Sequence, residues 1–141
     1  MTNPPPQNPA RTIRVIHLAL VTGPVLLLGV TAYLRTYGTE PLPSLAPIAG
    51  FILAVVGVLS IALATAVLRP RISPRAAGET ADAYWTAARN AQALTLWAVL
   101  EGAALLNVIG FFTTGQWSSV AVFFLAVIMM ILFRPGVLDR S

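Results

Sequence analysis

Four long apolar stretches dominate this chain and constrain its fold more than any other feature. His17 is the one ionisable residue in the first stretch and Glu101 is the one in the third, while the other two contain none. The stretches cover about residues 15–34, 45–68, 91–112 and 117–133. A helix needs about 20 residues to cross the hydrocarbon core of a bilayer. Because only 10% of the residues are charged, against roughly 25% in a soluble domain, the sequence predicts an all-α integral membrane protein, a four-helix transmembrane bundle.

The distribution of arginine predicts how this bundle lies in its membrane. With four spans, both ends of the chain lie on one side, together with the 69–90 linker. That side holds Arg11, Arg14, Arg69, Arg71, Arg75, Arg89, Arg134 and Arg140, and the other side holds only Arg35. Because arginine-rich loops stay in the cytoplasm, we expect a multi-pass protein of the bacterial inner (plasma) membrane with both termini cytoplasmic.

The boundaries of the bundle follow from the polar segments around it. We expect one transmembrane domain over residues 12–136, a disordered proline-rich cytoplasmic tail at 1–11 and a cytoplasmic tail at 137–141. After the loop at 69–75, a helix should restart near Thr80 and run into the third span. The turn at 113–116 is so short that spans three and four must be antiparallel neighbours.

An internal repeat is one interpretation of the two halves. Residues 16–33 align with 95–112 without gaps, and the alignment pairs Ala19 with Ala98 and Gly23 with Gly102. Two repeated helical hairpins would produce this pattern, and so would chance among apolar residues. Small residues four apart let helices approach closely in lipid, so Ala19, Gly23, Ala98 and Gly102 are predicted to pack helix one against helix three. The alternative is that Ala and Gly are simply abundant here.

Glu101 is the first candidate for chemistry. It lies near the middle of the third span, and an ionised side chain at that depth costs about 2.5–3.5 kcal/mol. Intramembrane carboxyls are therefore either functional, as ion or proton sites, or structural, as hydrogen-bonding groups that hold helices together. The sequence leaves both interpretations open for Glu101.

Two further polar residues complete the candidate intramembrane site. His17 shares a helix face with Pro24 and Thr31, and it lies five residues shallower than the position level with Glu101. This offset argues against a direct pair and leaves either a relay through water or an interfacial, hydrogen-bonded histidine. Asn107 is expected to form a hydrogen bond between helices.

Several function classes lack the residues they need. The chain has no cysteine and one histidine, so neither a zinc tetrad nor a bis-histidine haem site can form, and no other metal or cofactor motif is present. No phosphate-binding loop or nucleophile–base set is present either. We therefore expect no enzyme and no cofactor. Because the arginines are dispersed at the span ends, we also expect no nucleic-acid partner.

The chain resembles an uncharacterised group of small bacterial four-helix integral membrane proteins. The resemblance rests on 16–20 with Gly23, on Tyr84 with Ala87, on 97–105 and on the closing 133–135, and it covers most of residues 12–136. It implies an architecture and no activity. Residues 98–110 are also similar to the carboxylate helix of rotary-ATPase proteolipid c subunits. Because the glycine-rich first helix and the polar arginine loop of those subunits are missing, that likeness implies only that Glu101 titrates.

Two functions remain as hypotheses. The first is a non-enzymatic accessory or scaffold subunit in which Glu101 is an interior hydrogen-bonding lock. The alternative is a proton- or cation-handling protein that uses the Glu101 carboxyl. Either could be a homo-oligomer or part of a larger membrane complex, and a quinone or lipid between the helices remains open.

Overall fold

The computed structural model describes residues 8–38 and 47–139, and these form helices and no strand. The long helices are α1 (Pro9–Tyr37), α2 (Pro47–Leu63), α4 (Ala87–Thr114) and α5 (Trp117–Leu132). A π-helical turn, η1 (Ala64–Leu68), and a 3-10 turn, η2 (Arg69–Arg71), continue α2. Two single-turn helices, α3 (Ala81–Tyr84) and α6 (Pro135–Leu138), complete the fold. The prediction of an all-α protein is therefore confirmed.

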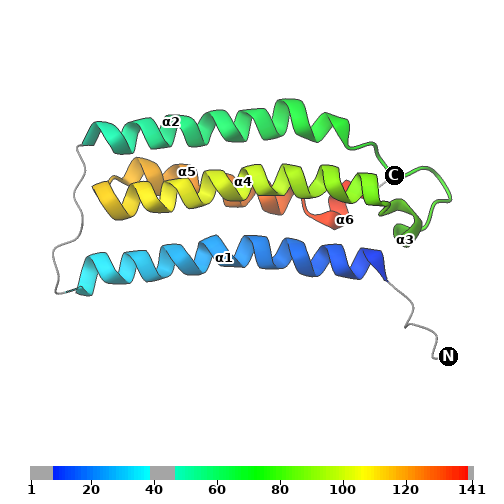
Figure 1. Cartoon of the computed structure of the whole chain (residues 1–141), viewed down its shortest axis with the longest axis horizontal. Helices are drawn as coiled ribbons and strands as arrows, with labels where there is room; N and C mark the ends of the chain where they lie inside the picture. The colour runs from blue at the N-terminus through cyan, green and yellow to red at the C-terminus, as the bar shows by residue number, and fades with distance from the viewer. Residues whose placement is uncertain (1–7, 39–46, 140–141) are drawn as a thin grey trace.

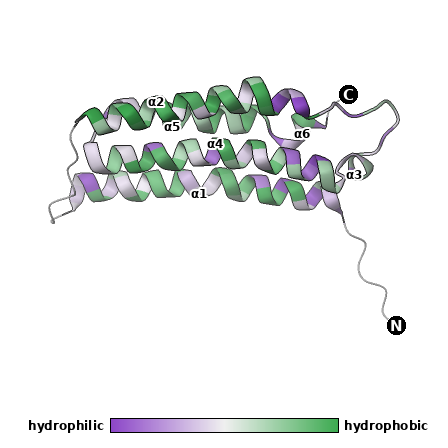
Figure 2. Ribbon diagram, turned by 45° about the horizontal axis from the view of Figure 1, so that its top comes forward, coloured by the Kyte–Doolittle hydropathy of each residue, from purple (hydrophilic) through white to green (hydrophobic). Residues whose placement is uncertain are grey.

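Three of the helices are long and apolar enough to cross a membrane. They are Pro9–Tyr37, Ile48–Arg71 and Ala87–Thr114, and Trp117–Leu132 is a shorter apolar helix. Figure 2 shows hydrophobic residues along most of α2 and α5, and polar residues gathered near the end that carries α3 and α6. Large apolar side chains are exposed on the outside of the bundle, including Phe51 and Leu59 of α2. A surface of this kind is that of a membrane protein.

Helix α4 is the central element of the bundle. It packs against α1, α2 and α5, whereas α1 and α2 barely contact each other. Figure 1 shows α1 and α2 on opposite sides of α4. The prediction that spans three and four are antiparallel neighbours is confirmed by α4 and α5. The first two helices do not form a packed pair of the same kind, so the two halves differ in packing, and the repeat remains a prediction about the sequence.

Glycine and alanine bring α2 close to α4. The buried positions of α2 and η1 are Gly50, Ala54, Gly57, Ile61 and Ala64, which alternate in steps of four and three residues. This spacing places them on one helical stripe. A Cβ added at Gly57 would meet Asn107 and Val122, and one added at Gly110 would meet Ser119. The closest approach, Gly57 to Asn107, is therefore at the α2–α4 contact, which was not predicted from the sequence.

The helix ends differ from three of the predicted boundaries. Helix α1 begins at Pro9, within the predicted disordered tail, because the Asn8 side chain accepts a hydrogen bond from the Arg11 amide at 2.9 Å. Residues 1–7 of that tail lie outside the described part. The C-terminal segment is helical to Leu138, which is buried. A helix does restart after Thr80, but it stops at Tyr84, and α4 begins anew after Thr86, whose hydroxyl caps it.

The linker and the C-terminal segment close one end of the bundle. The Tyr84 hydroxyl lies 2.8 Å from the Ser73 carbonyl and 3.0 Å from the Leu138 carbonyl, so it ties both segments to α3. Arg89 donates to Glu79 at 2.7 Å and covers the ring of Tyr84. This ion pair lowers the pKa of the Glu79 carboxyl.

The opposite end of α4 is closed by Arg35. Its guanidinium donates to the Phe112 carbonyl, where the unpaired carbonyls of a helix terminus favour a cation. Gly115 follows in the left-handed region, with φ of 71°. The single arginine at this end of the described chain therefore has a structural role.

Candidate functional site

Glu101 lies in the middle of α4, as expected, but no neighbouring helix holds it. Its side chain is partly exposed. No hydrogen bond or ion pair to Glu101 forms within residues 8–38 and 47–139. Within the described chain the Glu101 carboxyl therefore has no hydrogen-bonding partner, and its role as an interior lock stays a prediction.

The four small residues predicted to pack helix one against helix three also face outward. Ala19, Gly23, Ala98 and Gly102 are all exposed. A Cβ added at Gly23 or Gly102 would meet nothing within 4 Å. The predicted packing role is therefore wrong within the chain. The physical reason is that the buried face of α1 carries other residues, namely Ile13, His17, Pro24 and Thr31.

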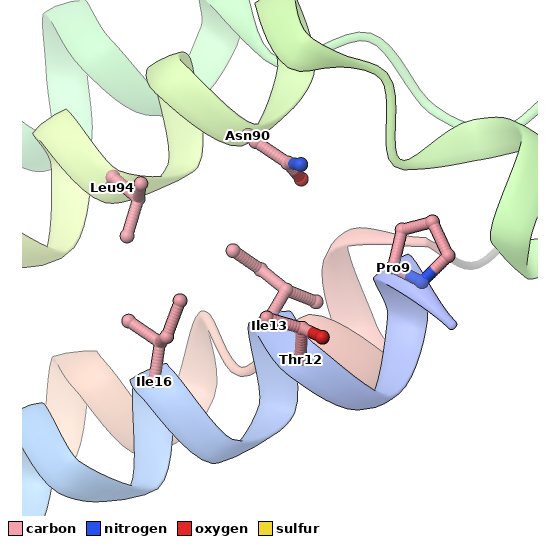
Figure 3. Close-up of a pocket in the computed structure, with 6 residues that line it drawn as sticks. All are labelled: Pro9, Thr12, Ile13, Ile16, Asn90 and Leu94. Atoms are coloured by element: carbon pink, nitrogen blue, oxygen red, sulfur yellow. The ribbon is translucent and has the colours of Figure 1, made fainter. Parts of the chain in front are cut away.

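Two cavities lie between α1 and α4, one toward each end of the helices. The larger, of about 390 Å³, is lined by Pro9, Thr12, Ile13, Ile16, Asn90 and Leu94. Figure 3 shows side chains from both helices pointing into it. The second, of about 200 Å³, is lined by Leu27, Val30, Thr31, Leu34, Val108, Ile109 and Phe112. We use the name α1–α4 groove for the two cavities together with the surface of α1 and α4 that lies between them; Glu101 lines neither cavity.

Helical spacing places Glu101 midway along this groove. Leu94 lines the first cavity and Val108 the second, and Glu101 is seven residues from each. Residues seven apart lie on nearly the same face of a helix. By the same spacing, Gly23 of α1 lies midway between Ile16 and Val30. The groove therefore has a hollow at each end, apolar apart from Thr12 and Asn90 at one end and Thr31 at the other. A carboxyl and a glycine lie in its middle.

His17 forms a separate polar cluster at the end of α5. Its Nε2 lies 3.0 Å from the Met130 carbonyl, and its ring meets the Trp97 ring edge-on with centroids 4.7 Å apart. The indole N–H of Trp97 donates to the Phe133 carbonyl at 2.8 Å. Both side chains thus satisfy carbonyls that the end of a helix leaves unpaired. His17 is therefore a hydrogen-bonded histidine, which was one of the two interpretations given for it above. No hydrogen bond joins it to Glu101 within the described chain.

Asn107 is buried but does not form the expected bond between helices. Its Nδ2 donates to the Ala103 carbonyl of its own helix at 2.8 Å. Its Oδ1 has no partner within the described chain, and the same holds for the buried Ser119 hydroxyl on α5. The prediction was wrong because Gly57 brings α2 against the amide and offers no side-chain hydrogen-bonding group.

The hydrogen bonds of Trp97 and Tyr84 to distant carbonyls were not predicted from the sequence. Both residues carry part of the resemblance described above. A usable signal was present, because the N–H of a buried Trp and the O–H of a buried Tyr usually find an acceptor. The carbonyls nearest to them in space belong to segments 36 to 54 residues away in sequence, which no local pattern identifies.

The chain matches no family model, no curated protein and no solved structure. The resemblances to small four-helix membrane proteins and to proteolipid c subunits therefore stay predictions. Within the described residues, no group of three or more His, Asp or Glu side chains could hold a metal ion. The feature of the described chain that bears most directly on function is thus the geometry around Glu101.

Proposed function

We propose that this chain spans the bacterial inner membrane four times, with both ends in the cytoplasm, and acts without catalysis as an accessory or scaffold subunit of a membrane assembly. The observation that carries the proposal is Glu101, which is partly exposed, mid-helix and without a polar partner in the described chain. Facing lipid, an ionised carboxyl there would cost about 2.5–3.5 kcal/mol. A protein partner that covers this face and hydrogen-bonds the carboxyl would offset that cost.

The orientation within the membrane is supported by where the arginines lie. Arg11, Arg14 and Arg89 are near the starts of α1 and α4, at the end that also carries η2 and α6. Arg35 is at the other end. The positive-inside rule then favours the α3 and α6 end as the cytoplasmic one. The fourth span would be α5, whose 16 residues reach about 24 Å at about 1.5 Å per residue, slightly less than the hydrocarbon core.

The alternative function is proton or cation handling through the Glu101 carboxyl. It is favoured by one observation, the lack of any hydrogen bond that would fix this carboxyl within the described chain. A carboxyl that is not locked can gain and lose a proton or a cation. One bundle of this size leaves little room for a water-filled path, so transport would need several copies.

Labelling with a hydrophobic carbodiimide tests the two functions. The reagent attacks protonated carboxyls and is read by mass spectrometry at Glu101, with the exposed Asp82 as an internal control. We expect Glu101 to be protected in native membranes and labelled after dissociation in detergent. Labelling in intact membranes that fades as the pH rises would instead support ion handling, especially if Glu101→Gln assembled normally and abolished proton flux in vesicles. Equal labelling before and after dissociation, at every pH, would contradict the subunit proposal.

A further inference from the structure

We propose that the α1–α4 groove is the docking surface for a second copy of this chain, with the Glu101 carboxyls of the two copies hydrogen-bonded to each other. This inference rests on the proposed function, because it names the partner that covers Glu101. It begins from the position of this carboxyl midway between two cavities that lie on the same side of the helix pair.

The middle of the groove is open to another helix. Ala98 and Gly102 flank Glu101 on α4, and Ala19 and Gly23 lie at the corresponding level of α1. All four are exposed, and no atom outside the helix lies where a Cβ of Gly23 or Gly102 would be. In lipid, small residues let the backbones of two helices approach closely. A helix from another molecule can therefore reach the depth of Glu101 without a clash.

A second copy meets the chemical requirement of this site directly. Two copies in one membrane share their orientation, and a two-fold axis along the membrane normal brings identical residues together at identical depth. Glu101 then faces Glu101. A carboxyl that keeps its proton is both a donor and an acceptor, so two such groups are complementary to each other. A lipid acyl chain could lie against the apolar side chains of the two cavities but offers the carboxyl no hydrogen bond.

Disulfide crosslinking in native membranes tests the proposed face. The natural chain contains no cysteine, so single-cysteine variants report one position each. We expect Ala98→Cys to give a covalent dimer under mild oxidation. The matched control is Leu59→Cys, near the middle of the apolar helix Ile48–Arg71, where the residue is 63% exposed on a different face. We expect this variant to remain monomeric under the same conditions.

Substitution of Glu101 tests the carboxyl pair. By energy transfer between labelled copies in lipid vesicles, Glu101→Leu should weaken dimerisation by roughly three- to thirtyfold, the range for hydrogen bonds between membrane helices. Glu101→Gln should retain most of the affinity, because an amide is also both donor and acceptor.

Three outcomes would overturn the inference. Dimers of Leu59→Cys as abundant as those of Ala98→Cys would mean random collision, and a Glu101→Leu protein that dimerises like the natural chain would remove the carboxyl pair. Crosslinks from Ala98→Cys to a different protein alone would exclude a second copy while leaving the proposed subunit function intact. The proposed subunit function has its own test. It is contradicted if the carbodiimide labels Glu101 equally before and after dissociation in detergent.

Discussion

Replacing Gly57 by alanine should destabilise the bundle at the contact between α2 and α4. The new Cβ would lie 2.8 Å from a methyl carbon of Val122 and would also collide with the Nδ2 of Asn107. The amide cannot move away freely, because it donates to the Ala103 carbonyl. Overpacking costs about 1–3 kcal/mol and a lost buried hydrogen bond a similar amount, whereas Gly→Ala in a helix gains about 1 kcal/mol. The expected net loss is roughly 1–5 kcal/mol of unfolding free energy.

The assay is unfolding in mixed micelles with a rising fraction of sodium dodecyl sulfate, followed by tryptophan fluorescence. Gly23→Ala is the matched control, because its Cβ would meet nothing, and it should leave stability unchanged or raise it by up to about 1 kcal/mol. In an Asn107→Ala background the loss from Gly57→Ala should shrink, since the colliding amide is gone. A Gly57→Ala protein as stable as the natural chain would refute the close packing inferred here.

The same micelle titration checks three further predictions. His17→Leu should cost about 1–3 kcal/mol, because it leaves an α5 carbonyl without its partner; no change would mean that this contact contributes nothing. Gly115→Ala should cost about 1–2 kcal/mol, since its φ of 71° disfavours any residue with a Cβ, whereas the unobstructed Gly136→Ala should not reproduce that loss. The pKa of Glu79 is lowered by Arg89, so its stabilising effect is present above the ordinary value of 4.5 and lost as the pH falls through the folded value. Arg89→Gln should reduce this acid sensitivity, and an unchanged pH profile would count against the ion pair.

The apolar stretches predicted the long helices, because the length of an apolar helix follows from the thickness of the bilayer core and not from tertiary contacts. Apolar length did not indicate that the helix restarting after Thr80 ends at Tyr84, nor that α6 forms. Those single turns depend on contacts distant in sequence, such as the Tyr84 hydroxyl at the Leu138 carbonyl. Helix α1 begins earlier than predicted because one capping side chain, Asn8, outweighs the polar composition of the tail.

The candidate site was predicted in position and not in environment. Depth along a helix follows from residue number, so Glu101 is mid-helix as expected. Whether a side chain faces a neighbouring helix or the outside depends on which face that neighbour covers. Small residues such as Ala19 suit either environment, whereas the alternating spacing of small residues from Gly50 to Ala64 in α2 was a readable signal of burial. The heptad face of His17, Pro24 and Thr31 was identified correctly, and all three are buried.

The central position of α4 has a consequence for how the molecule is made. A ribosome completes α1 and α2 before it reaches Ala87, and these two helices barely touch each other. Each must therefore be stable as a separate helix while translation continues, and their high apolar content makes this possible in lipid. The tertiary structure assembles only when α4 is released between them. The nascent chain therefore first becomes compact when α4, the third long helix to be synthesised, packs between the first two.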